Sequence, residues 1–378
     1  MKQFIYADNA ATTQLSKAAL DAMMPWMLGE YGNASQPYSF ARKPKKALVD
    51  ARAAIADCIN AQPDEIFFTS GGTESDNWVI KGSAFSDAQK RATITSAFEH
   101  HAILHSCYAI ERLGYPVAYL MPTEAGLITT KKLQTIISDT TRLVSIMYAN
   151  NEIGSIQPIK ELCEVAHSHG ALFHTDAVQA VGHVKIDVQE LGVDMLSASA
   201  HKFNGPKGIG FLYIRKGTTI SPYSDGGAQE MSHRAGTENI AAIVGMAAAL
   251  IENCNAMEEH IDKAHRLEKC LLDGLCAAHV TFSRNGGDNI LPGLLSLSFP
   301  GADGEAILHR MDLSGICIST GSACNSESTE ISHVLQAIRL DESLAKGTIR
   351  IALGKNNNED DVDRIVQALL RIVGQEVQ

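Results

Sequence analysis

The chain has 378 residues, 45% of them hydrophobic and 20% charged, a composition typical of an ordinary soluble globular protein. Its formal net charge of −11 excludes a general basic surface for nucleic-acid phosphates, so we expect no direct nucleic-acid partner. No apolar run reaches the roughly 20 residues that a membrane-spanning helix needs, and residues 1–8 lack the apolar core of a signal peptide. We therefore expect no membrane contact and a cytoplasmic location.

Short β-rich runs alternate with helical patterns through the middle of the chain. The expected strands are 66–69, 92–96, 143–148, 171–174, 195–199 and 209–214, and the expected helices between them include 74–85, 101–113 and 159–169. This alternation predicts an α/β fold with a mostly parallel central sheet.

The pattern changes near residue 255. A long charged helix is expected at 258–275, a strand at 294–298 and an amphipathic helix after Asn358. We predict a large domain of residues 15–254, and a smaller α+β domain formed by residues 1–14 and 255–378.

The eight cysteines have no paired CxxC spacing, which argues against a disulfide framework or a zinc knuckle. Most are expected to be small buried hydrophobic residues. Cys324 differs because it lies in Gly-Ser-Ala-Cys-Asn-Ser-Glu-Ser, a polar segment that predicts an exposed, mobile loop.

Lys202 and Asp176 each follow an expected strand, where the functional groups of a parallel sheet gather. Lys202 precedes a glycine-dense turn at 205–210, and its amine could form a Schiff base with pyridoxal 5′-phosphate (PLP). Asp176 could hold the pyridinium proton of that cofactor, and Gln179 could bind its phenolic oxygen. The plain alternatives are a solvated surface lysine and a helix-capping aspartate.

A strand is expected to turn into a helix at Thr69–Glu74, and the glycines of this turn leave backbone N–H groups free for a phosphate. Ser199 and His201 could add side-chain donors beside Lys202.

His100 follows the strand at 92–96 and is our candidate for stacking on the cofactor ring and for proton transfer. His101 and His105 share a helix face, which leaves a metal site as an alternative. No further ligand follows at a suitable spacing, so we expect no metal.

Together these residues resemble the cysteine desulfurases of the NifS/IscS type, in the class V aminotransferase group with PLP fold type I. The match runs from Asp8-Asn-Ala-Ala-Thr-Thr13 to Arg350-Ile-Ala-Leu-Gly354. Five blocks agree in order and spacing: 69–77, 99–100, 150–154, 174–179 and 199–210.

The resemblance implies that PLP is the cofactor and that L-cysteine is converted to L-alanine, with the sulfur held as a persulfide on Cys324. It implies catalytic roles for Cys324, Lys202 and His100, and substrate binding by Arg350 and Asn151. The implied cofactor-binding residues are Lys202, Gly72, Thr73, His100, Asn151, Asp176, Gln179, Ser199, His201 and Thr237. Thr237 would reach the phosphate of a neighbouring subunit, so a homodimer is expected, together with a sulfur-accepting protein of iron–sulfur assembly or tRNA thiolation.

The chain departs from the family pattern at Ala34, Gln36, Tyr38 and Ala41, and more mildly at Ala228 and Asn325. These changes leave the substrate preference and the partner open. The alternatives are a selenocysteine lyase or an aminotransferase of the same class, with Cys324 incidental, and a PLP-binding scaffold that only recruits sulfur acceptors.

Overall fold

The computed structural model describes residues 4–87, 89–320 and 331–376. A seven-stranded sheet forms its centre, in the order β2-β8-β7-β6-β5-β3-β4. The strands are β2 (Ile66–Thr69), β3 (Ala92–Ser96), β4 (Val117–Leu120), β5 (Thr141–Ser145), β6 (Leu172–Asp176), β7 (Met195–Ser199) and β8 (Gly210–Ile214). Only β8 runs against its neighbours, so the predicted α/β fold with a mostly parallel sheet is confirmed.

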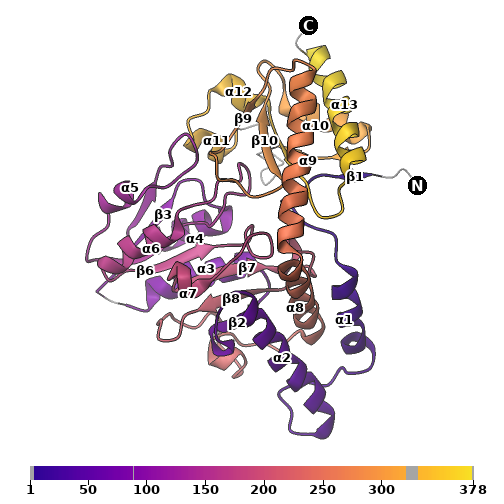
Figure 1. Cartoon of the computed structure of the whole chain (residues 1–378). Helices are drawn as coiled ribbons and strands as arrows, with labels where there is room; N and C mark the ends of the chain where they lie inside the picture. The colour runs from indigo at the N-terminus through magenta and orange to yellow at the C-terminus, as the bar shows by residue number, and fades with distance from the viewer. Residues whose placement is uncertain (1–3, 88, 321–330, 377–378) are drawn as a thin grey trace.

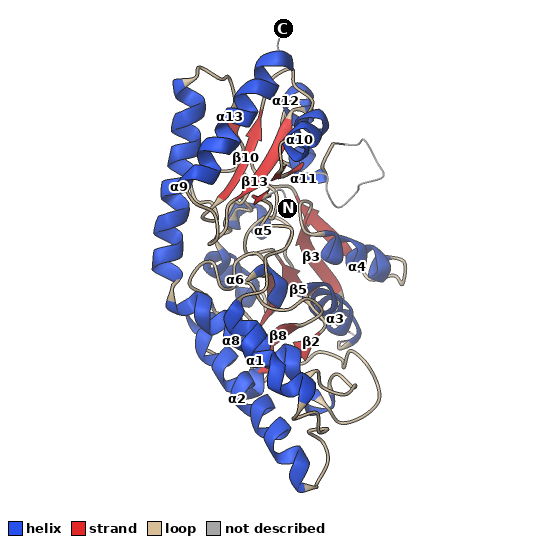
Figure 2. Ribbon diagram, turned by 90° about the vertical axis from the view of Figure 1, so that its right-hand side faces the viewer, coloured by secondary structure: helices blue, strands red, loops and turns tan. Residues whose placement is uncertain are grey.

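Alternate side chains of the strands enter two cores, one on each face of this sheet. On β2, Ile66 and Phe68 pack against one face, whereas Phe67 packs against the other. Helices α3 (Gly72–Phe85) and α4 (His101–Glu111) cover the second face, as Figure 2 shows beside β3. The first face is covered by α2 (Arg42–Cys58), α6 (Ile159–Ser168), α7 (Val188–Leu191) and α8 (Ile240–Asn255).

The C-terminal part builds a second layer around a four-stranded antiparallel sheet, β12-β13-β10-β9. Its strands are β9 (Ser283–Arg284), β10 (Leu294–Ser298), β12 (Ser319–Thr320) and β13 (Thr348–Ala352). Helices α9 (Met257–Ala277), α10 (Gly304–Leu313) and α13 (Glu359–Glu376) pack on it and enclose a separate core. Figure 1 shows α9 as the long helix that leads from α8 toward the C-terminal end.

The N-terminal strand β1 (Ile5–Tyr6) pairs in parallel with β11 (Ile316–Cys317), and Asp8 forms a bridge with Ala352 of β13. The first residues therefore belong to the same core as the C-terminal part. We propose residues 15–254 and 1–14 with 255–378 as two domains, and the separate cores support this division. The helices α11 (His333–Ala337) and α12 (Glu342–Lys346) contribute side chains to the larger core, so the two parts are closely joined.

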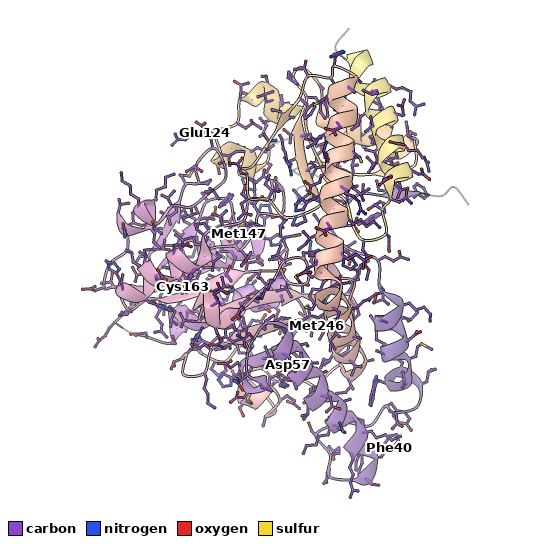
Figure 3. All side chains as sticks on the ribbon, viewed as in Figure 1. Phe40, Asp57, Glu124, Met147, Cys163 and Met246 are labelled. Carbon is purple, nitrogen blue, oxygen red and sulfur yellow. The ribbon has the colours of Figure 1, made fainter. Side chains whose placement is uncertain are left out.

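Helix α1 (Lys17–Leu28) packs against α8. Beyond it, the chain reaches the tip that Phe40 marks in Figure 3. Of the described helices, no single one is both long and apolar enough to cross a membrane, and only α8 and α9 together pass that test, as a pair bent by 68°.

Candidate active site

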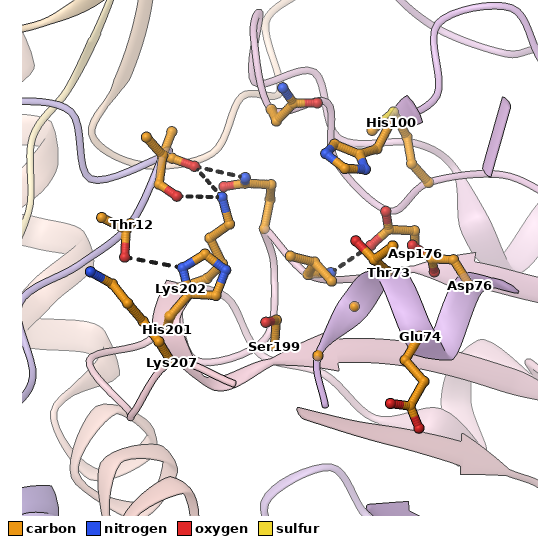
Figure 4. Close-up of a pocket in the computed structure, with 18 of the residues that line it drawn as sticks. Thr12, Thr73, Glu74, Asp76, His100, Asp176, Ser199, His201, Lys202 and Lys207 are labelled. Atoms are coloured by element: carbon orange, nitrogen blue, oxygen red, sulfur yellow. Dashed lines mark hydrogen bonds between the residues drawn. The ribbon is translucent and has the colours of Figure 1, made fainter. Parts of the chain in front are cut away.

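A pocket of about 550 Å³ opens where the carboxyl ends of β2, β6 and β7 meet the N-terminal segment and the smaller sheet. Ten of the residues that the sequence predicts line it, and Figure 4 labels several of them. They are Gly72, Thr73, His100, Asn151, Asp176, Gln179, Ser199, His201, Lys202 and Arg350.

Lys202 ends the short 3₁₀ turn (Ala200–Lys202) that follows β7, which directs its side chain into the pocket. Its Nζ donates to the carbonyl oxygens of Ala10 at 2.5 Å and Ala11 at 2.9 Å. Gln179 Nε2 donates to the same Ala10 oxygen at 3.0 Å, so the N-terminal segment holds both side chains (Figure 4). Lys202 is thus an oriented amine inside a pocket, not a solvated surface lysine.

Asp176 is the last residue of β6 and is 6% exposed. Its Oδ1 accepts a hydrogen bond from the backbone N–H of Val178 at 2.9 Å. Burial raises the pKa of Asp176 to about 6, while this N–H and the charge of Lys202 act in the opposite direction. A cationic ring nitrogen placed against this carboxyl group would favour its ionised form.

The turn between β2 and α3 has the shape of an anion cradle. Gly71 has φ of 147°, a backbone conformation that side chains disfavour, and α3 begins at the next residue. A Cβ on Gly72 would lie 2.5 Å from Val178 Cγ2, so the helix start packs closely against Val178, two residues after Asp176. The first N–H groups of a helix lack intrahelical acceptors, and here those of Gly72 and Thr73 lie in the pocket wall.

His100 is the N-cap of α4, and its Nδ1 accepts from the N–H of Ala102 at 3.1 Å. Burial, followed by the charge of Lys202, lowers the pKa of His100 to about 4. His100 is therefore neutral at pH 7 and carries its proton on Nε2. From an ordinary pKa near 6.5, the sequence suggested that His100 transfers protons. In this environment the imidazole is a neutral ring and a weak base, which favours stacking over proton transfer.

Arg350 lies in β13, which carries it from the smaller sheet to the pocket. One guanidinium nitrogen donates to Asp8 Oδ1 at 2.7 Å and the other to the carbonyl oxygen of Asn151 at 2.9 Å. Arg350 is 5% exposed, and its Nε has no hydrogen-bond partner among the described residues. The guanidinium is held in place and keeps donor capacity for a carboxylate.

His201 faces the N-terminal segment, where its Nδ1 lies 3.1 Å from the Thr12 hydroxyl (Figure 4). Burial, then the charges of Lys202 and Lys207, lowers the pKa of His201 to about 4. Ser199 is buried at the end of β7, and a Cβ on Gly71 would lie 3.4 Å from its hydroxyl oxygen. Both side chains therefore flank the phosphate cradle and the Lys202 turn as neutral groups.

One predicted residue among those that the structure describes does not line this pocket. Thr237 is exposed, on a segment that the Arg234–Glu74 ion pair (2.8 Å) ties to the first turn of α3. Cys324 lies outside the described residues.

Several pocket residues escaped the sequence argument. Asp76 of α3 is 1% exposed, and burial, then the charge of Asp176, raises its pKa well above the usual value. Ala10, Ala11 and Thr12 contact the Lys202 turn through backbone and hydroxyl groups. Contacts made by backbone carbonyl groups leave no signal in the sequence. Asp76 does leave one, because it lies one helical turn after Gly72 and therefore on the same helix face.

His101 and His105 have ring centroids 5.1 Å apart, and His333 lies 4.8 Å from His101 on the other side. Within residues 4–87, 89–320 and 331–376, no group of three or more His, Cys, Asp or Glu side chains is arranged to hold a metal ion.

The residues present fit PLP. The cradle at Gly71 and Gly72 suits the phosphate, because glycine backbone lies open where a side chain would clash. The buried carboxyl group of Asp176 could hold the ring nitrogen, Lys202 offers an amine in the same pocket, and the neutral imidazole of His100 offers a ring to stack on.

Comparisons with known proteins agree with this geometry. The family model described as aminotransferase class V matches residues 5–365. A protein named cysteine desulfurase IscS from Methanosarcina thermophila is 45% identical over 98% of this chain and 92% of its own length. Another of that name from Dictyoglomus turgidum is 46% identical over 99% of this chain and 95% of its own.

Solved structures give the same result. A NifS-like protein superposes with a TM-score of 0.92 at 35% identity, covering 99% of this chain and 100% of the other. A structure described as SspA in complex with cysteine has a TM-score of 0.83 at 38% identity, covering 93% and 99%. The chain belongs to the class V aminotransferases, a group of PLP-dependent enzymes with fold type I. Within that class, it is a member of the cysteine desulfurase family.

Proposed function

We propose that this protein is a PLP-dependent cysteine desulfurase that converts L-cysteine to L-alanine and passes the sulfur on as a persulfide of Cys324. The observation that carries the proposal is the meeting of Lys202, Asp176 and Arg350 in one pocket. An amine, a buried carboxyl group and a carboxylate-binding arginine together serve an amino acid bound to PLP.

Residues of this chain would hold the cofactor from all sides. Gly72 and Thr73 would bind the phosphate through backbone N–H groups, with Ser199 and His201 beside them. Asp176 would hold the ring nitrogen, Gln179 would bind the phenolic oxygen, and His100 would cover the ring. When bound, PLP supplies an electron sink that stabilises negative charge on the substrate Cα.

The substrate is oriented by Arg350 and Asn151, which bind its carboxylate. Lys202 would hold the cofactor through its amine, and the freed Nζ would take the Cα proton of the substrate and later return a proton to the product. With its lowered pKa, His100 stays neutral and would exclude water above the ring.

Cys324 is the sulfur acceptor in this scheme. Its thiolate attacks the sulfur of the substrate, an S–S bond forms, and the substrate C–S bond breaks with its electron pair on carbon. The carbon skeleton then takes up a proton and leaves as alanine, while the sulfur stays on Cys324 as a persulfide.

The protein acts as a homodimer in the cytoplasm and delivers sulfur to a partner protein of iron–sulfur assembly or tRNA thiolation. The exposed position of Thr237 supports a role in a neighbouring subunit, because the segment lies beside its own phosphate cradle without lining it. The exposed apolar side chains at the tip between α1 and α2, among them Leu28, Tyr31 and Phe40, support a contact with a second chain.

The test is alanine formation from L-cysteine by the purified holoenzyme and by Lys202→Ala and Cys324→Ser variants. We expect Lys202→Ala to lose both the visible cofactor absorption and alanine formation, and Cys324→Ser to keep the absorption but lose alanine formation. Undiminished turnover by Cys324→Ser would instead favour a lyase or aminotransferase that does not use this thiol. A yellow wild-type protein that forms no alanine would favour the scaffold.

A further inference from the structure

A pair of cysteines lies where α2 meets α8, away from the catalytic pocket. Cys58 is the last residue of α2, and Cys254 lies in the last turn of α8. The two helices pack along each other, and Figure 3 labels Asp57 and Met246 on them. The two thiols lie close enough that each is the first cause of the other's pKa shift.

Both thiols open into one pocket of about 750 Å³, whose wall includes residues 181–182, residues 184–186 and the start of α9. Cys58 and Cys254 are half-buried, so a small reagent can reach them. Cys107 and Cys163 are buried instead, and neither lines this pocket. Cys58 and Cys254 are therefore accessible to a small reagent, whereas the buried Cys107 and Cys163 are not.

The pair is chemically unequal. The neighbouring Cys58 thiol lowers the pKa of Cys254, whereas the Cys254 thiol, followed by burial, raises the pKa of Cys58. A dithiol of this kind has a defined order of reaction, because the thiol that ionises more readily attacks first.

We propose that Cys58 and Cys254 are a modification site, a dithiol that low-molecular-weight disulfides convert into an intramolecular disulfide. The Cys254 thiolate attacks one sulfur of the small disulfide, a mixed disulfide forms, and a small thiolate leaves. Cys58 then gives its proton to that thiolate and attacks the sulfur of Cys254, and the second small thiolate leaves. The two protein thiols lose two electrons in total, which reduce the small disulfide to two thiols.

The site is independent of the proposed desulfuration. Of the described residues that line this pocket, none also lines the catalytic pocket. If no disulfide forms between Cys58 and Cys254, the proposed desulfurase function is not affected. If the protein does not desulfurate cysteine, the dithiol proposal is not affected either.

The experiment treats the full-length holoenzyme with 2-hydroxyethyl disulfide, which carries no amine and so cannot react with PLP. Free thiols are then alkylated under denaturing conditions, and the unreduced protein is digested and analysed by mass spectrometry. We expect a cross-linked peptide pair containing Cys58 and Cys254.

Single substitutions test the two steps. Cys58→Ser should leave the mixed disulfide trapped on Cys254, because a serine cannot attack it. Cys254→Ser leaves no second thiol in the pocket, so no intramolecular disulfide should form at Cys58. Cys270→Ser is the matched control, since Cys270 is exposed on α9 and its loss should not change the cross-link. A wild-type protein modified at Cys270 without any Cys58–Cys254 cross-link would overturn the proposal, as would a Cys58→Ser protein whose Cys254 stays unmodified.

Discussion

Several side chains of the pocket have pKa values that burial and neighbouring charges shift away from their usual values. Lys202, Asp176 and His100 could be predicted from the sequence because each follows a strand that ends at the same edge of the sheet. Their electrostatic state could not, because burial and the neighbouring charges are set by segments far away in the chain. His100 shows this plainly, since it becomes a neutral group with a pKa of about 4.

Arg350 tests the substrate-binding proposal. Arg350→Lys keeps a positive charge but loses the planar fork that contacts Asp8 and the Asn151 carbonyl and grips a carboxylate. We expect the KM for L-cysteine to rise by about ten-fold or more, with the cofactor absorption unchanged. Steady-state alanine formation measures this change, and an unchanged KM would remove Arg350 from the substrate site.

Glu99 makes stability depend on pH in a defined direction. Its carboxyl group is fully buried, and burial raises its pKa from 4.5 to about 8, although Ser96 and the Met147 N–H donate to it. The folded state therefore holds a proton that the unfolded state loses, and stability falls as pH rises from 4.5 toward 8.

Glu99→Gln, which mimics the protonated acid, should reduce this fall. Urea unfolding of the cofactor-free protein at pH 6 and pH 8 is the measurement, with wild type as the reference. The same loss of stability in both proteins would mean that Glu99 does not titrate in this range.

At the scale of elements, the strands and helices of the central α/β part could be predicted where apolar runs are strong. β2, β3, β7 and β10 have the expected bounds, and α13 begins after Asn358 as expected. The prediction for 143–148 was shifted, because β5 covers Thr141–Ser145 and the apolar residues after it enter the core as a loop. The sequence did not predict β4, because its residues are mostly half-buried at the edge of the sheet and form no strong apolar run. It also did not predict the reversed direction of β8, because strand direction has no local sequence signal.

Gly210, at the start of β8, tests the contact between the sheet and the phosphate cradle. A Cβ there would lie 2.4 Å from the Ala198 carbonyl oxygen and 2.8 Å from Gly71 Cα, both backbone atoms that cannot turn aside. We expect Gly210→Ala to cost about 1–3 kcal/mol of stability and to weaken PLP retention, because the cradle must move.

Gly29→Ala is the matched control, because its Cβ would have only an ordinary contact at 3.8 Å. Denaturant unfolding and cofactor release on dialysis measure the two effects. Equal behaviour of the two variants would show that the cradle tolerates a side chain at Gly210.

For the whole molecule, the sequence resemblance covers almost the entire chain, and the fold agrees with it. The contacts of the N-terminal residues with the site could not be predicted, because each spans more than 180 positions of sequence. Asp8 contacts Arg350, Ala10 contacts Lys202, and Thr12 contacts His201. These contacts join the two cores around one pocket. The proposed second subunit would complete it.

Complementation tests that subunit arrangement. Lys202→Ala and Thr237→Ala proteins are each expected to be impaired, one without its amine and the other with weaker cofactor binding. If Thr237 serves the partner's site, a mixed dimer carries one intact site, and mixing the two proteins with subunit exchange should restore alanine formation. Activity that stays at the sum of the separate variants would place Thr237 in its own subunit's site or outside any site.

The most direct test of the central claim is mass spectrometry of the holoenzyme after incubation with L-cysteine, with free thiols alkylated before digestion. The proposed function predicts one added sulfur atom on the peptide that contains Cys324, and none on that peptide in the Lys202→Ala variant. Formation of alanine without added sulfur on Cys324 would contradict it.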